Sequence, residues 1–195
     1  MKLILIRHGE TRWNAIQKYQ GHTDIPLNDR GRQQAARLAE HLKATEQVEA
    51  VYCSDLLRAH ETAAIVARPF QIEPVSDRRL REFHFGNWEG LTFNQVYASY
   101  REEFEQWFNN PEDFRVPGGE SFSDLARRSL EAIEDICMKH AGTTLIITHG
   151  GVIKVMLCQL QSISNPWQET VPPGSLTEIN LVAGRMQLQH FGVVV

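Results

Sequence analysis

Two stretches of this chain decide its fold: Leu3-Ile4-Leu5-Ile6-Arg7-His8-Gly9 and Leu145-Ile146-Ile147-Thr148-His149-Gly150. Each passes through consecutive apolar residues without polar alternation and then reaches a histidine followed by glycine. Apolar runs of this kind are typical of strands buried on both faces, as in a parallel sheet covered by helices. Such sheets bind ligands beyond the carboxyl ends of their strands. We therefore expect the two strands to bring two imidazoles to one edge of the same sheet. The alternative is a pair of core histidines with satisfied ring nitrogens, but Arg7 and the glycines beside each histidine favour a site.

Outward from these two units, the pattern alternates between strands and helices. Asn28 is expected to cap a helix that runs to about Lys43, Ser54 a helix to about Ala67, and Ser121, with Asp124 in a capping box, a long helix. The other expected segments are strand 2–8, strand 49–53, a short strand near 72–76, an irregular loop 77–90, helical segments over 91–108, a loop 109–120, strand 143–148, helix 150–160, and a final hairpin of strands 176–182 and 186–191. The alternation predicts an α/β fold: a three-layer α/β/α sandwich whose mostly parallel sheet has an antiparallel edge.

Length and composition indicate an ordinary globular protein. A chain of 195 residues is expected to form one domain, 1–195. The net charge of −4 gives no reason to expect a nucleic acid or an anionic membrane as partner. The first apolar run stops at Arg7, too early for a secretion signal, and no run approaches membrane-spanning length. Cys53, Cys137 and Cys158 form no CxxC pair, which favours a reducing, cytoplasmic location; the last two are expected to be buried.

Charged residues at the strand ends point to an anion site. Arg7 lies at the end of strand 2–8, and Arg58 lies one turn into the helix expected after strand 49–53. If these strands are parallel, both arginines are expected beside the histidines. The planar fork of arginine suits phosphate oxygens, and backbone amides at the helix that opens with Gly150 would add donors. Taken alone, Glu82 in the loop 77–90 would be a solvated carboxylate, but within this constellation it could donate the proton that an alcohol leaving group needs.

Other chemistries are less well supplied. The chain has no G-x-S-x-G serine elbow and no P-loop. His8 and His149 could in principle hold a metal, but Arg7 and Arg58 would oppose a cation there. We therefore expect neither a metal nor another cofactor.

With these residues, the sequence resembles the histidine phosphatase superfamily, in the branch that holds cofactor-dependent phosphoglycerate mutase and small-molecule phosphatases. The resemblance covers nearly the whole chain. Its motifs are Leu5-Ile-Arg-His-Gly-Glu-Thr11, Trp13-Asn14, Gln20-Gly21, Pro26-Leu27, Ser54-Asp-Leu-Leu-Arg58-Ala, Glu61-Thr62-Ala63, Arg81-Glu82, Phe85-Gly86-Asn-Trp-Glu-Gly90, Pro117-Gly-Gly-Glu-Ser121 and Thr148-His-Gly-Gly151.

The resemblance implies a role for each matching residue. His8 would be the phosphorylated nucleophile and Glu82 the proton donor, and Arg7, Arg58 and His149 would form the phosphate pocket. Further phosphate or substrate contacts are expected from the first loop and the second histidine unit: Thr11, Asn14, Gln20, Gly21 and Gly150. No metal is implied. The role of His84 stays ambiguous, with a place at the rim favoured.

The substrate is expected to depend on a cap segment, 83–120. Residues 83–114 hold ten of the chain's 17 aromatic residues. One set at helical spacing is expected to form the local core of the cap: Phe93, Tyr97, Tyr100, Phe104 and Phe108. A second set could line a pocket for an organic body: Phe83, Phe85, Trp88, Trp107 and Phe114.

Residues 82–124 carry nine carboxylates against Arg101 and Arg115. An acidic cap would favour a monophosphate with an uncharged body over a compact polyanion. Together with a similarity in 100–121 to α-ribazole phosphatases, this predicts α-ribazole 5′-phosphate, or a similar small phosphate ester, as substrate. The alternatives are a phosphoglycerate mutase, a broad-specificity phosphatase, and an inactive phosphate-binding module.

Overall fold

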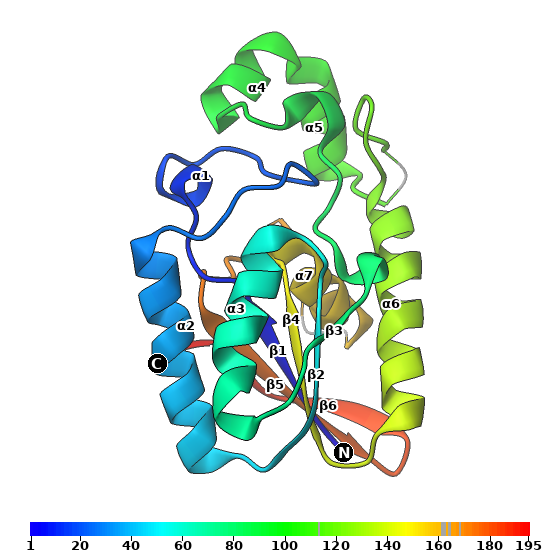
Figure 1. The fold of residues 1–195 in the computed structure, drawn as a ribbon. Helices are drawn as coiled ribbons and strands as arrows, with labels where there is room; N and C mark the ends of the chain where they lie inside the picture. The colour runs from blue at the N-terminus through cyan, green and yellow to red at the C-terminus, as the bar shows by residue number, and fades with distance from the viewer. Residues whose placement is uncertain (113, 161–162, 164, 168) are drawn as a thin grey trace.

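The sheet places the two histidine-bearing strands side by side at its centre (Figure 1). The computed structural model describes residues 1–112, 114–160, 163, 165–167 and 169–195. Over these residues six strands form one sheet in the order β3-β2-β4-β1-β5-β6. The strands are β1 Lys2–Arg7, β2 Val48–Cys53, β3 Val75–Ser76, β4 Thr143–Thr148, β5 Ser175–Val182 and β6 Arg185–Val194. The first four in this order are parallel to one another, whereas β5 is antiparallel to both of its neighbours, β1 and β6, which confirms the expected mixed sheet.

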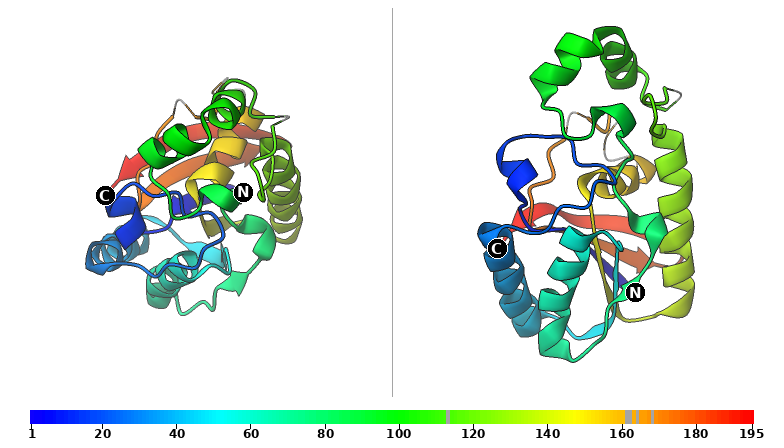
Figure 2. Two further views of the ribbon diagram at one scale, coloured as in Figure 1. Left: turned by 90° about the horizontal axis from the view of Figure 1, so that it is seen from above. Right: turned by 45° about the horizontal axis from the view of Figure 1, so that its top comes forward.

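Helices cover both faces of this sheet, as Figure 2 shows from two further directions. The helices are α1 Arg12–Ala15, α2 Asp29–Thr45, α3 Leu57–Ala67, α4 Phe93–Ser99, α5 Arg101–Asn109, α6 Phe122–Lys139 and α7 Gly150–Gln159, with short 3-10 turns η1 Arg68–Phe70, η2 Arg78–Leu80 and η3 Gly86–Trp88. Alternate residues of β1 point to opposite faces. Ile4 and Ile6 pack in the apolar cluster of α2 and α3, and Leu3 and Leu5 in the cluster of α6 and α7. The three-layer α/β/α fold is therefore confirmed.

Two of the three expected helix caps are present. Asn28 accepts the Gly31 amide at 2.8 Å, and Ser121 forms its capping box with Asp124. The expectation for Ser54 is wrong, because α3 begins at Leu57. The Ser54 amide is still bonded to the carbonyl of Ile147 at 3.0 Å, so this residue continues the path of β2. The Asp24 carboxylate, from a distant loop, accepts the Leu57 amide at 2.7 Å and so takes the place of a local cap.

Other departures from the expected elements also have local causes. The short strand expected near 72–76 reduces to β3, because Pro74 has no amide hydrogen for sheet pairing. The helical segment 91–108 divides into α4 and α5 at Tyr100, whose φ of −138° and ψ of 42° are not helical. The loop before α2 contains the one-turn helix α1, capped by Thr11, and the loop 77–90 contains η2 and η3.

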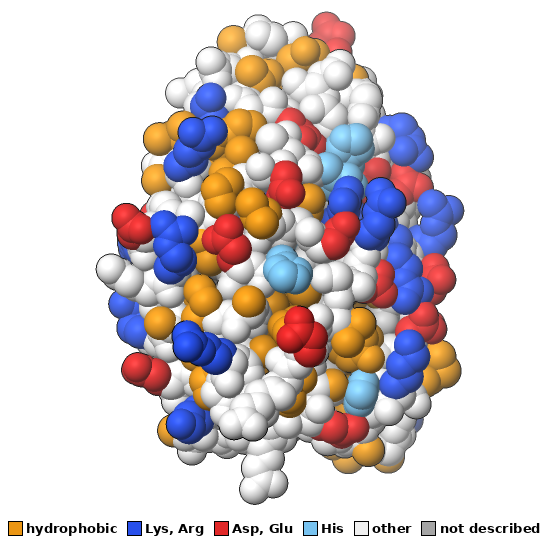
Figure 3. Space-filling view, in the orientation of Figure 1, with side chains coloured by type: hydrophobic (Ala, Val, Ile, Leu, Met, Phe, Trp, Pro, Cys, Tyr) orange, Lys and Arg blue, Asp and Glu red, His pale blue; other side chains and the backbone are white. Residues whose placement is uncertain are grey.

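Helices α4 and α5 lie beyond the carboxyl ends of the parallel strands, at the top of Figure 1. The surface in that orientation intersperses acidic and basic side chains rather than gathering one sign into a single field (Figure 3). Within the described residues, no helix is both long and apolar enough to cross a membrane. Cys53 is buried, while Cys137 and Cys158 are only partly buried, which corrects the expectation for those two.

Candidate active site

The two imidazoles meet at the sheet edge. Arg7 of β1 is in register with Thr148 of β4, so His8 and His149 leave neighbouring parallel strands at the same level. Their ring centres lie 5.1 Å apart in an edge-to-face arrangement, and both side chains are almost completely buried. The expected convergence is thus present in the structure.

The hydrogen bonds of His8 decide which ring nitrogen faces the cavity. Nδ1 lies 2.7 Å from the carbonyl oxygen of Gly9, which can only accept, so Nδ1 carries the proton. Nε2 then carries the lone pair, and Arg58 Nε donates to it at 3.3 Å. Nε2 is therefore the atom from which an attack on phosphorus would start.

Burial and positive neighbours keep both imidazoles neutral. Burial is the main cause that lowers the pKa of His8 well below 6.5, and the cations Arg58 and Arg7 lower it further. The pKa of His149 is also well below 6.5, first because of burial and then because of Arg58. A neutral imidazole is what a histidine nucleophile requires.

Backbone carbonyls, rather than carboxylates, hold the two arginines. Arg7 Nη1 donates to the carbonyl of Val171, and Arg58 donates to the carbonyls of Thr23 at 3.1 Å and Gly21 at 2.7 Å. Burial lowers the pKa of Arg58 to about 10, and it also lowers that of Arg7. Arg7 Nε and both ring nitrogens of His149 have no hydrogen-bond partner among the described residues. Buried donors of this kind suit an anion that brings its own acceptors.

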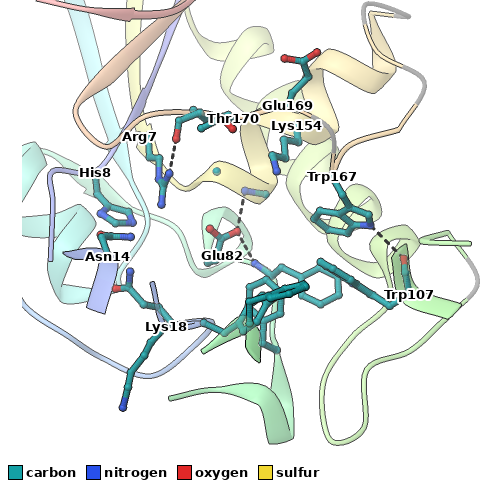
Figure 4. A pocket seen from close by; sticks show the side chains of 18 of the residues that line it. Arg7, His8, Asn14, Lys18, Glu82, Trp107, Lys154, Trp167, Glu169 and Thr170 are labelled. Carbon is teal, nitrogen blue, oxygen red and sulfur yellow. Dashed lines mark hydrogen bonds between the residues drawn. The ribbon is translucent and has the colours of Figure 1, made fainter. Parts of the chain in front are cut away.

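Glu82 reaches the same cavity from the loop after η2. Its Oε1 accepts the amides of Phe83 and Gly151, both at 2.9 Å (Figure 4). A Cβ on Gly151 would lie 2.3 Å from this oxygen, so only glycine leaves room for the contact. The backbone carbonyl of Glu82 accepts from Arg128 Nη2 at 2.7 Å and from His22 Nε2 at 2.9 Å. The carboxylate is thus fixed from both its side chain and its backbone.

The remaining predicted contacts divide into lining and supporting residues. Asn14, Gln20 and Gly150 line the cavity, but Thr11 does not. The Thr11 hydroxyl lies 3.1 Å from the amide oxygen of Asn14 and 2.9 Å from that of Gln20, which leaves both NH₂ groups as donors for a ligand. Gly21 contributes its carbonyl to Arg58, and its φ of +52° is one that glycine adopts readily.

The cavity beside these residues measures about 400 Å³ and has a strongly aromatic wall. The aromatic residues that line it are Tyr19, Phe83, Phe85, Phe93, Phe104, Trp107, Phe108 and Trp167. The division expected from helical spacing is therefore partly wrong. Three residues assigned to the local core (Phe93, Phe104 and Phe108) line the cavity, whereas Trp88 is fully buried and Phe114 lies outside the lining.

The charge of the cap does not reach the cavity. Of the described carboxylates only Glu82 and Glu169 line it, together with the cations Lys18 and Lys154. Two carboxylates of the cap bind elsewhere: Glu89 accepts the amides of His22 and Thr23, and Glu120 pairs with Arg128 at 2.6 Å. The negative net charge of the cap sequence therefore does not make the described cavity lining acidic, because net charge along the sequence does not say which way side chains point.

His84 lies outside the described cavity lining, which agrees with a place away from the chemistry. Its ring stacks on that of His22 at 4.5 Å, and its side chain is 39% exposed.

Several residues of the site had no assigned role in the sequence, among them Val171, Trp167 and Lys154. The carbonyl of Val171 orients Arg7, and only the folded chain reveals this contact. Trp167 stacks on Trp107 at 4.1 Å and extends the aromatic wall. Lys154 follows Gly150 by four residues on α7, so helical spacing from the second histidine unit could have identified it.

Comparison with known proteins agrees with this geometry. The family model of the histidine phosphatase superfamily (branch 1) matches residues 3–194, and the chain therefore belongs to that superfamily. The expectation of an enzyme that acts on phosphate monoesters is confirmed at this level.

Individual relatives carry several activity names. The chain is 44% identical over 156 residues to phosphoglycerate mutase-like protein 4 of Arabidopsis thaliana, and the aligned region covers 78% of this chain and 68% of that protein. It is 38% identical over 167 residues to the metal-independent phosphoserine phosphatase of the same plant, with 84% and 70% covered. Among solved structures it resembles the α-ribazole phosphatase of Shigella flexneri, with a TM-score of 0.87, 29% identity, and 99% and 97% of the two chains covered.

Proposed function

We propose that this protein hydrolyses small phosphomonoesters in two steps, with His8 as the nucleophile. The observation that carries the proposal is that His8 Nε2, two buried arginines and the carboxylate of Glu82 share one cavity. The donors of Arg7, Arg58 and His149 would surround the equatorial oxygens of a phosphoryl group, where negative charge spreads in the transition state.

In the first step, the lone pair of Nε2 attacks phosphorus and the bond to the ester oxygen breaks. A phosphoryl oxygen takes over the Arg58 Nε–H that otherwise points at Nε2. Glu82 in its protonated form gives its proton to the departing alkoxide, so that an alcohol leaves. In the second step, water attacks phosphorus, Glu82 takes the proton of that water, and the bond between phosphorus and His8 Nε2 breaks, which frees His8 and inorganic phosphate. Division into two displacements replaces one difficult step with two easier ones.

The aromatic wall supports a substrate with an organic body, and α-ribazole 5′-phosphate is our first candidate. An aromatic base could stack on this wall, at about 0.5–1.5 kcal/mol for each ring pair beyond burial. We assign the selection to residues 83–120 as the cap of a single domain, 1–195. The charge argument for the same substrate no longer supports it, because Glu82 is the only described carboxylate of 82–124 that lines the cavity. The cysteine pattern supports our further proposal of a cytoplasmic location.

Lys154 favours a second candidate, a phosphomonoester with an additional acidic group. O-phosphoserine is one such compound, and a relative of this chain is named for it. A mutase acting on phosphoglycerate would share this preference but would have to retain the phosphorylated intermediate.

The test of the proposal is to trap the intermediate. Labelled phenyl phosphate mixed with the enzyme and quenched within milliseconds should give an acid-labile, base-stable phosphoprotein, with the label on the peptide that contains His8. His8→Ala should lose both the label and the turnover, whereas His60→Ala, at an exposed position on α3, should retain both. An equally labelled His8→Ala protein would refute the assignment.

A further inference from the structure

Lys154 is a cation of the cavity that the proposed phosphate chemistry does not use. It lies on α7, three and four residues after Gly151 and Gly150, and residues at this spacing share one face of a helix. All three line the cavity. In Figure 4 the ammonium end of Lys154 points into the cavity, on the side of Glu82 and Trp167, whereas the ammonium of Lys18 points away from it.

The surroundings of Lys154 leave its charge poorly compensated. Within the described part of the chain it forms no hydrogen bond or ion pair, and its Nζ lies 5.3 Å from the ring centre of Trp167. Burial lowers the pKa of Lys154, and the carboxylates of Glu82 and Glu169 only partly oppose this change. A partly buried ammonium without an acceptor is unfavourable, and an anionic ligand group would supply that acceptor.

The direction of the proposed reaction places Lys154 on the leaving-group side. The phosphoryl group lies between His8 and the arginines, and Glu82 protonates the ester oxygen. The rest of the substrate therefore extends past Glu82, toward the wall formed by Lys154 and Trp167. We propose that Lys154 binds a carboxylate carried by the alcohol half of the substrate, an inference that rests on the proposed function.

The charge of this wall favours a carboxylate over a second phosphate. The first phosphate position has two arginines and a histidine, whereas the second offers a single ammonium near Glu82 and Glu169. One ammonium suits a monoanion, and the nearby carboxylates would repel a dianion. The preferred substrates are thus phosphate esters of small hydroxy acids, including hydroxylated amino acids.

Matched pairs of substrates test this inference. We would measure kcat/KM for phenyl phosphate and 3-carboxyphenyl phosphate, and for phosphoethanolamine and O-phosphoserine. The unmodified enzyme should prefer the carboxylate member of each pair. Lys154→Met should lower kcat/KM for that member by roughly 10- to 100-fold, the range of a charge-assisted hydrogen bond, and leave phenyl phosphate within about twofold. Lys154→Arg should restore part of the preference, and Lys43→Met, at an exposed position on α2, should retain it.

Failure of the role of Lys154 and failure of the proposed function would give different results in these experiments. No carboxylate preference in the unmodified enzyme, or a preference that survives in Lys154→Met, would overturn the inference. So would an equal loss on both members of a pair, because Lys154 would then serve the phosphate itself. Turnover of phenyl phosphate with labelled His8 shows that the proposed function holds even if the role of Lys154 fails. Absence of both would mean instead that the proposed function fails.

Discussion

Backbone amides hold the Glu82 carboxylate in place, without a charged partner for its side chain. The amides of Phe83 and Gly151 both donate to Oε1, and an amide oxygen at the same position could accept the same bonds. Glu82→Gln therefore removes the transferable proton while it preserves the geometry, which makes it a sharp probe of the proposed role.

We expect the effect of Glu82→Gln to depend on the leaving group. Alkyl phosphates need a proton on the departing oxygen, whereas nitrophenolate leaves without one. The variant should lose about 10²–10⁴-fold in kcat/KM on glycerol phosphate but much less on 4-nitrophenyl phosphate. Steady-state kinetics with both esters would measure this, with Glu102→Gln, an exposed change on α5, as control. Equal losses on both esters would indicate an electrostatic role instead.

The site residues that could be predicted from the sequence are those whose positions follow from the pattern of strands and helices. His8 and His149 come directly after apolar strands, and parallel pairing of those strands is sufficient to bring them together. Arg7 and Arg58 reach the same cavity, as expected from their places at strand-helix junctions, and Glu82 reaches it too, although only the constellation and the family resemblance indicated its role. The carbonyl of Val171 and the ring of Trp167 were not predictable, because a backbone oxygen has no sequence signature and the placement of Trp167 depends on tertiary packing against Trp107.

The start of α7 shows how one element serves both binding and acid catalysis. Gly150 and Gly151 are adjacent and both lie in the first helical turn. A Cβ on Gly150 would meet its nearest atoms at 3.8 Å, an ordinary contact, whereas a Cβ on Gly151 would overlap Glu82 Oε1. The two positions therefore form a matched pair for the same substitution.

We expect Gly151→Ala to reduce turnover of alkyl phosphates much more than Gly150→Ala does. The Gly151 variant must displace the flexible end of Glu82, which costs little stability but removes the proton donor from its position. Alanine is favoured over glycine within a helix by about 0.5–1 kcal/mol, so neither variant should unfold. Kinetics with glycerol phosphate, together with urea unfolding, would check this. Similar activities in the two variants would contradict the positioning role of this helix start.

Helix ends that depend on local capping residues were predicted correctly, whereas helix ends that depend on distant contacts were not. Asn28 and Ser121 cap their helices by local hydrogen bonds. The start of α3 instead depends on Asp24, which is 33 positions away from Leu57. Which face of α4 and of α5 lies against the cavity could not be predicted from the sequence either. The two helices meet at a break at Tyr100 that helical spacing alone did not predict.

At the scale of the whole molecule, the buried histidines link stability to pH. The folded-state pKa values of His8 and His149 lie well below 6.5, the unperturbed value to which the unfolded chain returns. Below about pH 6.5 the unfolded state therefore binds more protons than the folded state. The free energy of unfolding is expected to be undiminished by these residues above that pH and to fall as the pH decreases through it.

Each neutral buried histidine should lower the free energy of unfolding by up to about 1.4 kcal/mol per pH unit in this range. Urea titrations at pH 7.5, 6.5 and 5.5 would measure the slope. His149→Asn should reduce the slope relative to the unmodified protein, and His41→Asn, at an exposed position, is the matched control. Parallel slopes for the unmodified protein and His149→Asn would show that His149 does not contribute.

Arg7, Arg58 and His149 form no ion pair with a carboxylate among the described residues, and this affects the stability of the native state. Among the described residues, Arg7 Nε and the ring nitrogens of His149 have no hydrogen-bond partner, so an oxyanion that binds there would satisfy groups that the fold leaves unpaired. Inorganic phosphate, the product of the proposed reaction, would then stabilise the native state as well as compete with the substrate, by about 2.7 kcal/mol at a hundredfold excess over its dissociation constant. Replacement of His149 by an apolar residue would remove buried nitrogens that the described residues leave unpaired, and it would also remove a donor for the phosphate. A more stable version of this protein is therefore not automatically a more active one.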